Sequence, residues 1–184
     1  ALGLTGTLTN HGIAVDFIGS DALDAPELHQ SSLIHFLNLR RDQSRDASLL
    51  RKVARIFAYY LRLIRYAASA KPRVFHILWN NKFEFVDRVP LMLYYRALRK
   101  RVVLTAHNVN ACKRDGKDSF FNRLTLRIQY RLCRHIFVHT PRMKAELEID
   151  FRLSPSKVSV IPFGINNTTP IAGMTRQAAR ARYG

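Results

Sequence analysis

The chain has 184 residues, 47% of them hydrophobic, which is enough to build the core of one domain of ordinary size and argues against disorder. Its formal net charge is +17, because 30 lysines and arginines outnumber 13 acids. No apolar run approaches the roughly 18 residues of a membrane span, and no charged-then-apolar signal opens the chain, so a cytoplasmic location is expected.

The positive charge is unevenly distributed. Residues 1–39 contain no lysine or arginine, whereas residues 40–184 hold all 30 of them. Such an excess suits nucleic acid, an anionic membrane surface or a phosphate-bearing substrate. The two cysteines, Cys112 and Cys133, lack the spacing typical of zinc ligands, so we expect no metal.

Helices and short apolar strands are expected to alternate along the chain. The first helix is expected to end before Gly12, and Pro90 to kink a later helix or to mark its first turn. Helices are expected at residues 1–9, 49–64, 83–98, after Ser119 and after the cap Thr140. Strands are expected at residues 13–18, 33–39, 74–79, 101–105, 135–139 and 157–161.

After Arg101, the run Val102-Val103-Leu104-Thr105 is continuously apolar or β-branched, which predicts a strand covered on both faces, as in a parallel sheet. An α/β domain normally begins with a strand, but this chain begins with a helix, and its first residue is not Met. We therefore expect a fragment that lacks its amino-terminal strand.

Polar side chains follow three of these strands. In an open parallel sheet, ligands bind outside the carboxyl ends of the strands. His107 and Asn108 follow the strand at residues 101–105, and Asn80, Asn81 and Thr140 follow two others. The histidine either fixes its loop or takes part in binding and chemistry. The other polar residues are candidates by position, and they could equally cap helices.

The helix at residues 49–64 has apolar residues at three- and four-residue spacing and a basic opposite side. One interpretation is a stripe that faces the core, and the other is a helix on a membrane surface with arginines at anionic lipid. The apolar stripe is Leu50, Val53, Phe57, Tyr60, Leu61 and Ile64. A later helix carries the row Arg123, Arg127, Arg131 and Arg134, which is typical either of phosphate binding or of a solvated face.

The last third of the chain carries a recognisable motif. Val138-His139-Thr140-Pro141 is followed by Lys157-Val158 and by Val160-Ile161-Pro162-Phe163-Gly164-Ile165-Asn166. This order resembles the end of the amino-terminal domain of the GT-B retaining glycosyltransferases of family four. Those enzymes commonly have asparagine where Phe163 stands and aspartate where Asn166 stands. His107 also matches a histidine that the family places near the transferred sugar.

The resemblance implies two facing Rossmann-like halves, each a parallel sheet with helices on both faces. Residues 1–165 would be the acceptor-side half, and residues 166–184 the linker and the start of a donor half that is not in this sequence. The family places its first strand in the middle of the sheet, so its loss would leave two unpaired strand edges. This fragment alone is then expected to be inactive.

The activity implied is transfer of a sugar, as by a hexosyltransferase, from a nucleotide-sugar to an acceptor, with retention and without a metal cofactor. The acceptor is either soluble or linked to a lipid. With a lipid-linked acceptor, the enzyme would be a peripheral protein on the inner face of the membrane. In this reading His107 hydrogen-bonds the donor sugar, and catalysis depends on positioning and charge stabilisation. A basic nucleic-acid-binding module is the alternative, although the aromatic residues fall on apolar helix faces and no nucleic-acid motif is present.

Overall fold

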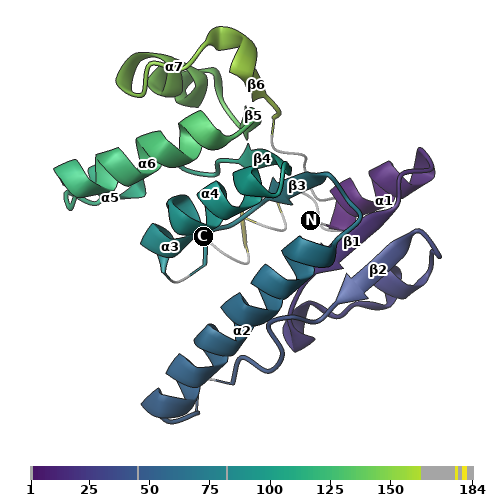
Figure 1. Ribbon diagram of the computed structural model, residues 1–184. Coiled ribbons are helices and arrows are strands. Elements are labelled where there is room, and N and C mark those ends of the chain that lie inside the picture. The colour runs from purple at the N-terminus through teal and green to yellow at the C-terminus, as the bar shows by residue number, and fades with distance from the viewer. Residues whose placement is uncertain (1, 45, 82, 163–176, 178–179, 182–184) are drawn as a thin grey trace.

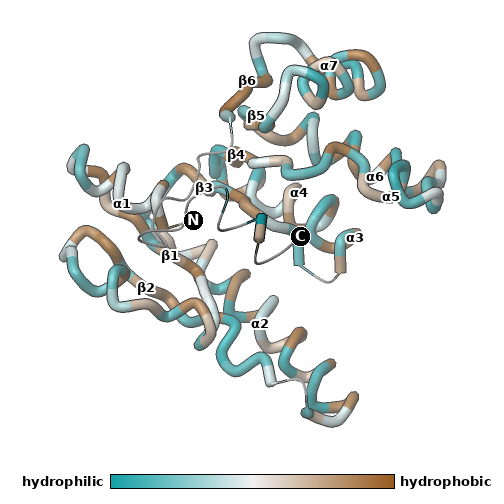
Figure 2. Tube along the Cα trace, turned by 180° about the vertical axis from the view of Figure 1, so that it is seen from behind, coloured by the Kyte–Doolittle hydropathy of each residue, from teal (hydrophilic) through white to brown (hydrophobic). Residues whose placement is uncertain are grey.

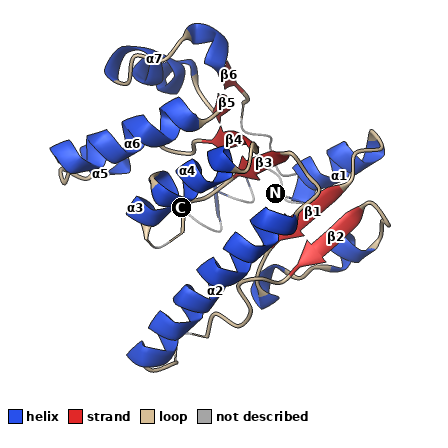
Figure 3. Ribbon diagram, in the orientation of Figure 1, coloured by secondary structure: helices blue, strands red, loops and turns tan. Residues whose placement is uncertain are grey.

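The computed structural model describes residues 2–44, 46–81, 83–162, 177, 180 and 181. Parallel strands alternate with helices, which confirms the expected α/β fold (Figure 1, Figure 3). The expected linker and following helix at residues 166–184 lie almost entirely outside the described residues, as do Phe163, Gly164, Ile165 and Asn166 of the motif.

The elements follow the expected order with shifts of a few residues at their ends. The helices are α1 (Leu2–Asn10), α2 (Leu49–Ser69), α3 (Glu84–Arg88), α4 (Pro90–Ala97), α5 (Ala111–Arg114), α6 (Phe120–Leu132) and α7 (Pro141–Asp150). The strands are β1 (Val15–Ile18), β2 (Ile34–Leu37), β3 (Val74–Ile77), β4 (Arg101–Thr105), β5 (His135–Val138) and β6 (Val158–Val160). Short 3-10 turns occupy Asp21–Leu23, Pro26–His29 and Pro155–Lys157.

Local sequence signals explain most of these boundaries. The hydroxyls of Ser48, Ser119 and Thr140 each accept a hydrogen bond from a backbone N–H in the first turn of α2, α6 and α7. Gly12 ends the α1 region at a φ of 73°, the left-handed conformation that glycine adopts without strain. Pro90 has no N–H to donate and separates α3 from α4. The strong cap of α2 is therefore Ser48.

The strands form two sheets rather than one. Within the described residues, β1 pairs with β2, and β3, β4, β5 and β6 pair in that order, all in parallel. No described strand pairs with both β1 and β3. This is the break in the sheet that was expected, and it leaves one edge of each sheet unpaired.

The larger sheet buries one of its faces. Val102, Leu104, Ile136 and Val138 are buried there against the core, over which α3, α4 and α6 pack. The alternate residues Val103, Thr105 and Phe137 are only half-buried. The prediction that the strand at residues 101–105 is covered on both faces therefore holds on one face within the described part of the chain.

The apolar stripe predicted to face the core is on the outside of α2. Leu50 and Phe57 are 83% and 72% exposed, and Val53, Leu61 and Ile64 are exposed as well. The helix instead buries Tyr59, Tyr60, Leu63 and Ala67, and its amino-terminal end extends beyond the body of the domain (Figure 1, Figure 2). The core-facing interpretation was wrong for every stripe residue except Tyr60, because Tyr59, Leu63 and Ala67 beside the stripe take the inner positions.

Helix α6 buries a face that is partly polar. Its buried residues are Asn122, Thr125, Leu126, Gln129 and Tyr130. Phe121 and Leu124 are exposed, and so are the four arginines of the row, of which Arg134 lies beyond the end of the helix. Among the described residues, no helix is long and apolar enough to cross a membrane.

Candidate functional site

Three neighbouring strands of the larger sheet end side by side, because β3, β4 and β5 are parallel and paired in register. The residues that follow them are Trp79, Asn80 and Asn81 after β3, His107 and Asn108 after β4, and His139 and Thr140 after β5. These segments meet at the carboxyl edge of the sheet, where ligands of open α/β sheets bind.

An aromatic column connects the three strand ends. The ring of Trp79 stacks on that of His107, with centroids 4.1 Å apart and planes 13° apart. His107 in turn stacks on His139, with centroids 4.8 Å apart. The indole is 66% exposed, so the column is open to solvent on the Trp79 side. Each ring restricts the next, which holds the His107 imidazole in one orientation.

Hydrogen bonds determine which nitrogen atoms in the column carry protons. Nδ1 of His139 lies 3.1 Å from the carbonyl oxygen of Ile161, which can only accept, so this nitrogen donates. Nε2 of a neutral His139 is then an acceptor, and Nδ1 of His107 donates to it over 2.9 Å. Nε2 of His107 therefore has a lone pair in the neutral pair.

The electrostatics of the site favour a neutral His107. Burial, and next the His139 ring, lowers the pKa of His107. The lowered pKa favours the uncharged imidazole at neutral pH.

Asn80 and Asn81 both hold the loop after β3 in place. The amide of Asn80 exchanges two hydrogen bonds with the buried Gln129 on α6, at 2.8 and 3.3 Å. The side chain of Asn81 donates to Asp87 over 2.9 Å and accepts from Arg40. Both side chains are engaged within the protein, so their contribution to the site is to fix the backbone beside Trp79.

Asp87 is the buried centre of this support. It is 3% exposed and accepts hydrogen bonds from the Tyr60 hydroxyl, from the Asn81 backbone N–H and from the Asn81 amide. Burial raises the pKa of its carboxyl group, while the hydrogen bonds from Asn81 and Tyr60 oppose that rise. The network ties α2 and α3 to the loop after β3.

The two remaining candidates, Asn108 and Thr140, differ in whether the side chain is engaged within the protein. Asn108 is exposed beside His107, and its side-chain oxygen lies 3.5 Å from a nitrogen of Arg114, at the limit of a hydrogen bond. Thr140 uses its hydroxyl to cap α7 by accepting from the N–H of Met143 over 3.2 Å. Thr140 is therefore a helix cap in this structure, whereas the Asn108 side chain is exposed next to His107.

Sequence reasoning did not identify Trp79 or His139 as members of the site. Trp79 was assigned to the end of a strand, and His139 was considered only as part of the family motif. The available signal was that Trp79, His107 and His139 each lie at or just after the end of a predicted strand.

Comparison with known proteins identifies one family. The sequence model described as Glycosyltransferase Family 4 matches residues 1–168, which include every element from α1 to β6 and all three rings of the column. No curated protein matches the chain. The family match confirms the resemblance indicated by the motif at the end of β5 and β6.

Proposed function

Because the chain belongs to glycosyltransferase family 4, we propose that it is the acceptor-side half of an enzyme that transfers a sugar from a nucleotide-sugar to an acceptor with retention of configuration. The observation that carries the proposal is the column of Trp79, His107 and His139 at the carboxyl edge of the sheet. It holds a neutral imidazole at the position where an α/β sheet binds its ligand.

His107 is the residue that we assign to the reaction. Its Nε2 accepts a hydrogen bond from a hydroxyl of the donor sugar and so orients the anomeric carbon toward the acceptor. Positioning of this kind lowers the barrier without a protein nucleophile, because correct alignment alone supplies a large part of a rate enhancement. Asn108, exposed beside His107, is assigned a hydrogen bond to the same sugar or to the acceptor.

His139 and Trp79 are positioning residues. His139 selects the tautomer of His107 through the 2.9 Å hydrogen bond, and Trp79 restricts its ring by stacking. Asn80, Asn81 and Thr140 support the backbone of the same edge. Donor phosphate contacts are assigned to a second half of the enzyme, as the family resemblance implies, and no metal is required by the residues described.

We also propose that the enzyme works at the inner, cytoplasmic face of a membrane, on a lipid-linked acceptor. The support is the exposed apolar stripe of α2, in which Leu50 and Phe57 are 83% and 72% exposed, together with the net charge of +17. Helices with an exposed apolar side and nearby basic residues bind at the surface of anionic bilayers.

The test uses a panel of radiolabelled sugar nucleotides with short-chain lipid-linked and soluble acceptors. The complete enzyme should transfer label, and the anomeric configuration of the product should match that of the donor. Residues 1–184 alone should transfer none. Turnover by this segment alone would show that the active site is misplaced, and an inverted product would rule out the retaining assignment.

A further inference from the structure

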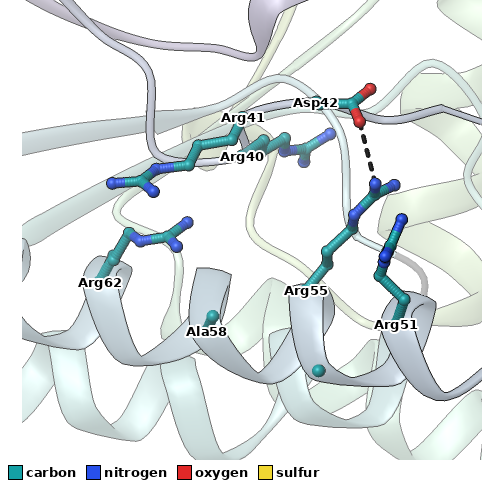
Figure 4. Close-up of a pocket in the computed structure, with 8 residues that line it drawn as sticks. Arg40, Arg41, Asp42, Arg51, Arg55, Ala58 and Arg62 are labelled. Carbon is teal, nitrogen blue, oxygen red and sulfur yellow. Dashed lines mark hydrogen bonds and ion pairs between the residues drawn. The ribbon is translucent and has the colours of Figure 1, made fainter. Parts of the chain in front are cut away.

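Five arginines surround a cavity of about 370 Å³ on the side of α2 next to the loop that follows β2 (Figure 4). We call this group the arginine cradle: Arg40, Arg41, Arg51, Arg55 and Arg62. Figure 4 shows that the first two approach from the loop and the other three rise from the helix. The column of Trp79, His107 and His139 contains none of these side chains, although Arg40 donates to Asn81 in the loop beside Trp79.

The helix leaves room for a ligand at the base of the cradle. Ala54 and Ala58 line the cavity. Figure 4 shows the short side chain of Ala58 between Arg62 and Arg55. Residues three and four apart lie on the same face of a helix, so Arg51, Arg55 and Arg62 share one side with these alanines. The apolar stripe occupies a different side of α2, where it is exposed.

Contacts with the protein fix three of the guanidinium groups. Arg62 donates to the carbonyl oxygen of Leu39 over 2.9 Å, and Arg55 pairs with Asp42 at 2.9 Å. Arg40 donates to Asn81 and lies over the Tyr59 ring, 5.1 Å from its centroid. The cradle is thus preorganised by contacts with the protein, which reduces the entropic cost of binding.

The positive charge of the cradle is not balanced by the protein. Asp42 is the one carboxylate that lines the cavity, and it is paired with Arg55. Within the part of the chain that the structure describes, the guanidinium groups of Arg41 and Arg51 make no hydrogen bond or ion pair. Like charges four residues apart on a helix, such as Arg51 and Arg55, destabilise it. A bound anion would offset this repulsion.

We propose that the arginine cradle binds a phosphate group. Guanidinium groups are suited to it because their planar, paired N–H donors match phosphate oxygens, and several of them converge here on one cavity. The phosphate belongs either to the headgroup of an anionic lipid or to a soluble phosphate ester. Binding of a lipid headgroup depends on the membrane role proposed above, whereas phosphate binding by the cradle does not.

The test measures phosphate binding separately from sugar transfer. In the complete protein, inorganic pyrophosphate is titrated calorimetrically, and binding to phosphatidylglycerol vesicles is measured by co-flotation against phosphatidylcholine vesicles. The cradle variant Arg41→Gln/Arg51→Gln changes the two arginines that have no protein partner among the described residues. The matched control, Arg127→Gln/Arg131→Gln, removes the same charge from exposed positions on α6.

The cradle variant should bind pyrophosphate, anionic vesicles or both about tenfold more weakly, because two charge-assisted contacts are lost. The control should bind within about twofold of wild type, since exposed charges act only through screened attraction. Loss confined to pyrophosphate identifies a soluble phosphate ester, and loss that includes vesicles identifies a lipid headgroup. Equal losses of affinity in both variants, or no binding of either probe by the wild-type protein, would contradict the proposed phosphate site. Sugar transfer is assayed independently, so its failure leaves this result unaffected.

Discussion

The hydroxyl of Tyr66 on α2 donates a hydrogen bond of 2.7 Å to Asp16 on β1. The ring of the same tyrosine stacks on Phe75 of β3, with centroids 6.1 Å apart. One side chain thus bridges the two sheets, which have no strand pairing with each other among the described residues. Burial, and then the hydrogen bond to Asp16, raises the pKa of the Tyr66 hydroxyl, so it remains a donor throughout the physiological range.

The first prediction concerns this bridge. Tyr66→Phe keeps the stacking on Phe75 but removes one of the two hydrogen-bond partners of Asp16, the other being His35. It should lower the free energy of unfolding by about 1 kcal/mol, the usual net value of one hydrogen bond. Urea denaturation provides the measurement. Tyr94→Phe is the control, because its hydroxyl makes an exposed bond to the Ile64 carbonyl. Equal losses in both variants would show that Tyr66 has no special role between the sheets.

The second prediction concerns the buried carboxylate that holds the loop beside Trp79. Asp87→Ala should lower the free energy of unfolding by about 2–4 kcal/mol, because Tyr60 and Asn81 lose their acceptor in a buried place. Asp115→Ala, an exposed carboxylate, should change it by less than about 0.5 kcal/mol. Thermal or urea unfolding distinguishes the two. A mild effect of Asp87→Ala would mean that water replaces the carboxylate.

The sequence predicts most elements because each depends on local features. Apolar runs specify the strands, and Ser119, Thr140 and Pro90 set helix boundaries where they were expected. The break between the two sheets was expected from the family resemblance rather than from composition, whereas the order of the strands comes from the structure alone.

The faces of the helices and the members of the site were harder to predict. Helix α2 has two apolar sides, and only contacts with distant residues decide that Tyr60 is buried and Phe57 exposed. Asn80 was a candidate ligand-binding residue because it is polar and follows a strand. Its amide instead bonds to Gln129, which lies 49 residues further along the chain. Contacts over such separations depend on tertiary packing, which periodicity in the sequence does not reveal.

The third prediction tests the assigned role of His107 in the complete enzyme. His107→Ala should lower kcat by about a hundredfold or more while leaving acceptor binding almost unchanged, as expected when a contact is stronger in the transition state than in the ground state. His11→Ala removes an exposed histidine far along the chain from the site and should retain the wild-type rate. A normal rate for His107→Ala would make this histidine a residue that only fixes its loop.

The fourth prediction concerns His139, which acts on the reaction through His107. His139→Gln can still donate to the Ile161 carbonyl but removes the imidazole that helps to lower the pKa of His107. Its kcat should fall less than that of His107→Ala, and the acid side of its pH–rate profile should shift. The profile of kcat against pH, measured for wild type and variant, checks this. An unchanged profile would show that the two imidazoles are not coupled in the reaction.

The fifth prediction follows from the pKa shifts of two histidines. Burial lowers the pKa of His76, and burial followed by the His139 ring lowers that of His107, relative to the ordinary value of about 6.5. The unfolded chain therefore takes up protons at a higher pH than the folded chain. The stabilisation is fully present above about pH 6.5 and is lost as the pH falls toward the lowered values.

Unfolding by urea at a series of pH values between 7.5 and 5 measures this effect. The free energy of unfolding should decrease as the pH falls, and the decrease should be smaller for His76→Gln/His107→Gln. Comparison with wild type removes the contributions of Asp87 and Glu146, whose pKa values are raised by burial and have the opposite effect. Identical pH dependence in both proteins would contradict the assigned shifts.

The last prediction separates a membrane-surface enzyme from a nucleic-acid binder by the response to salt. Attraction between charges weakens as the Debye length falls from about 10 Å at 0.1 M to about 3 Å at 1 M, so binding to duplex DNA should collapse steeply. Anionic vesicles should be retained at higher salt, because the exposed Phe57 and Leu50 add an apolar contribution that salt does not screen.

The variant Leu50→Ser/Phe57→Ser removes that apolar contribution without changing the charge. Its vesicle binding should fall with salt as steeply as its DNA binding, while its DNA affinity should equal that of wild type. Flotation and fluorescence anisotropy at four salt concentrations give the two slopes. DNA binding by wild type could instead persist at salt concentrations where vesicle binding is lost. That result would assign a nucleic-acid-binding role to the exposed arginines Arg123, Arg127, Arg131 and Arg134. The membrane role would then have to be abandoned, whereas the family assignment rests on a separate comparison.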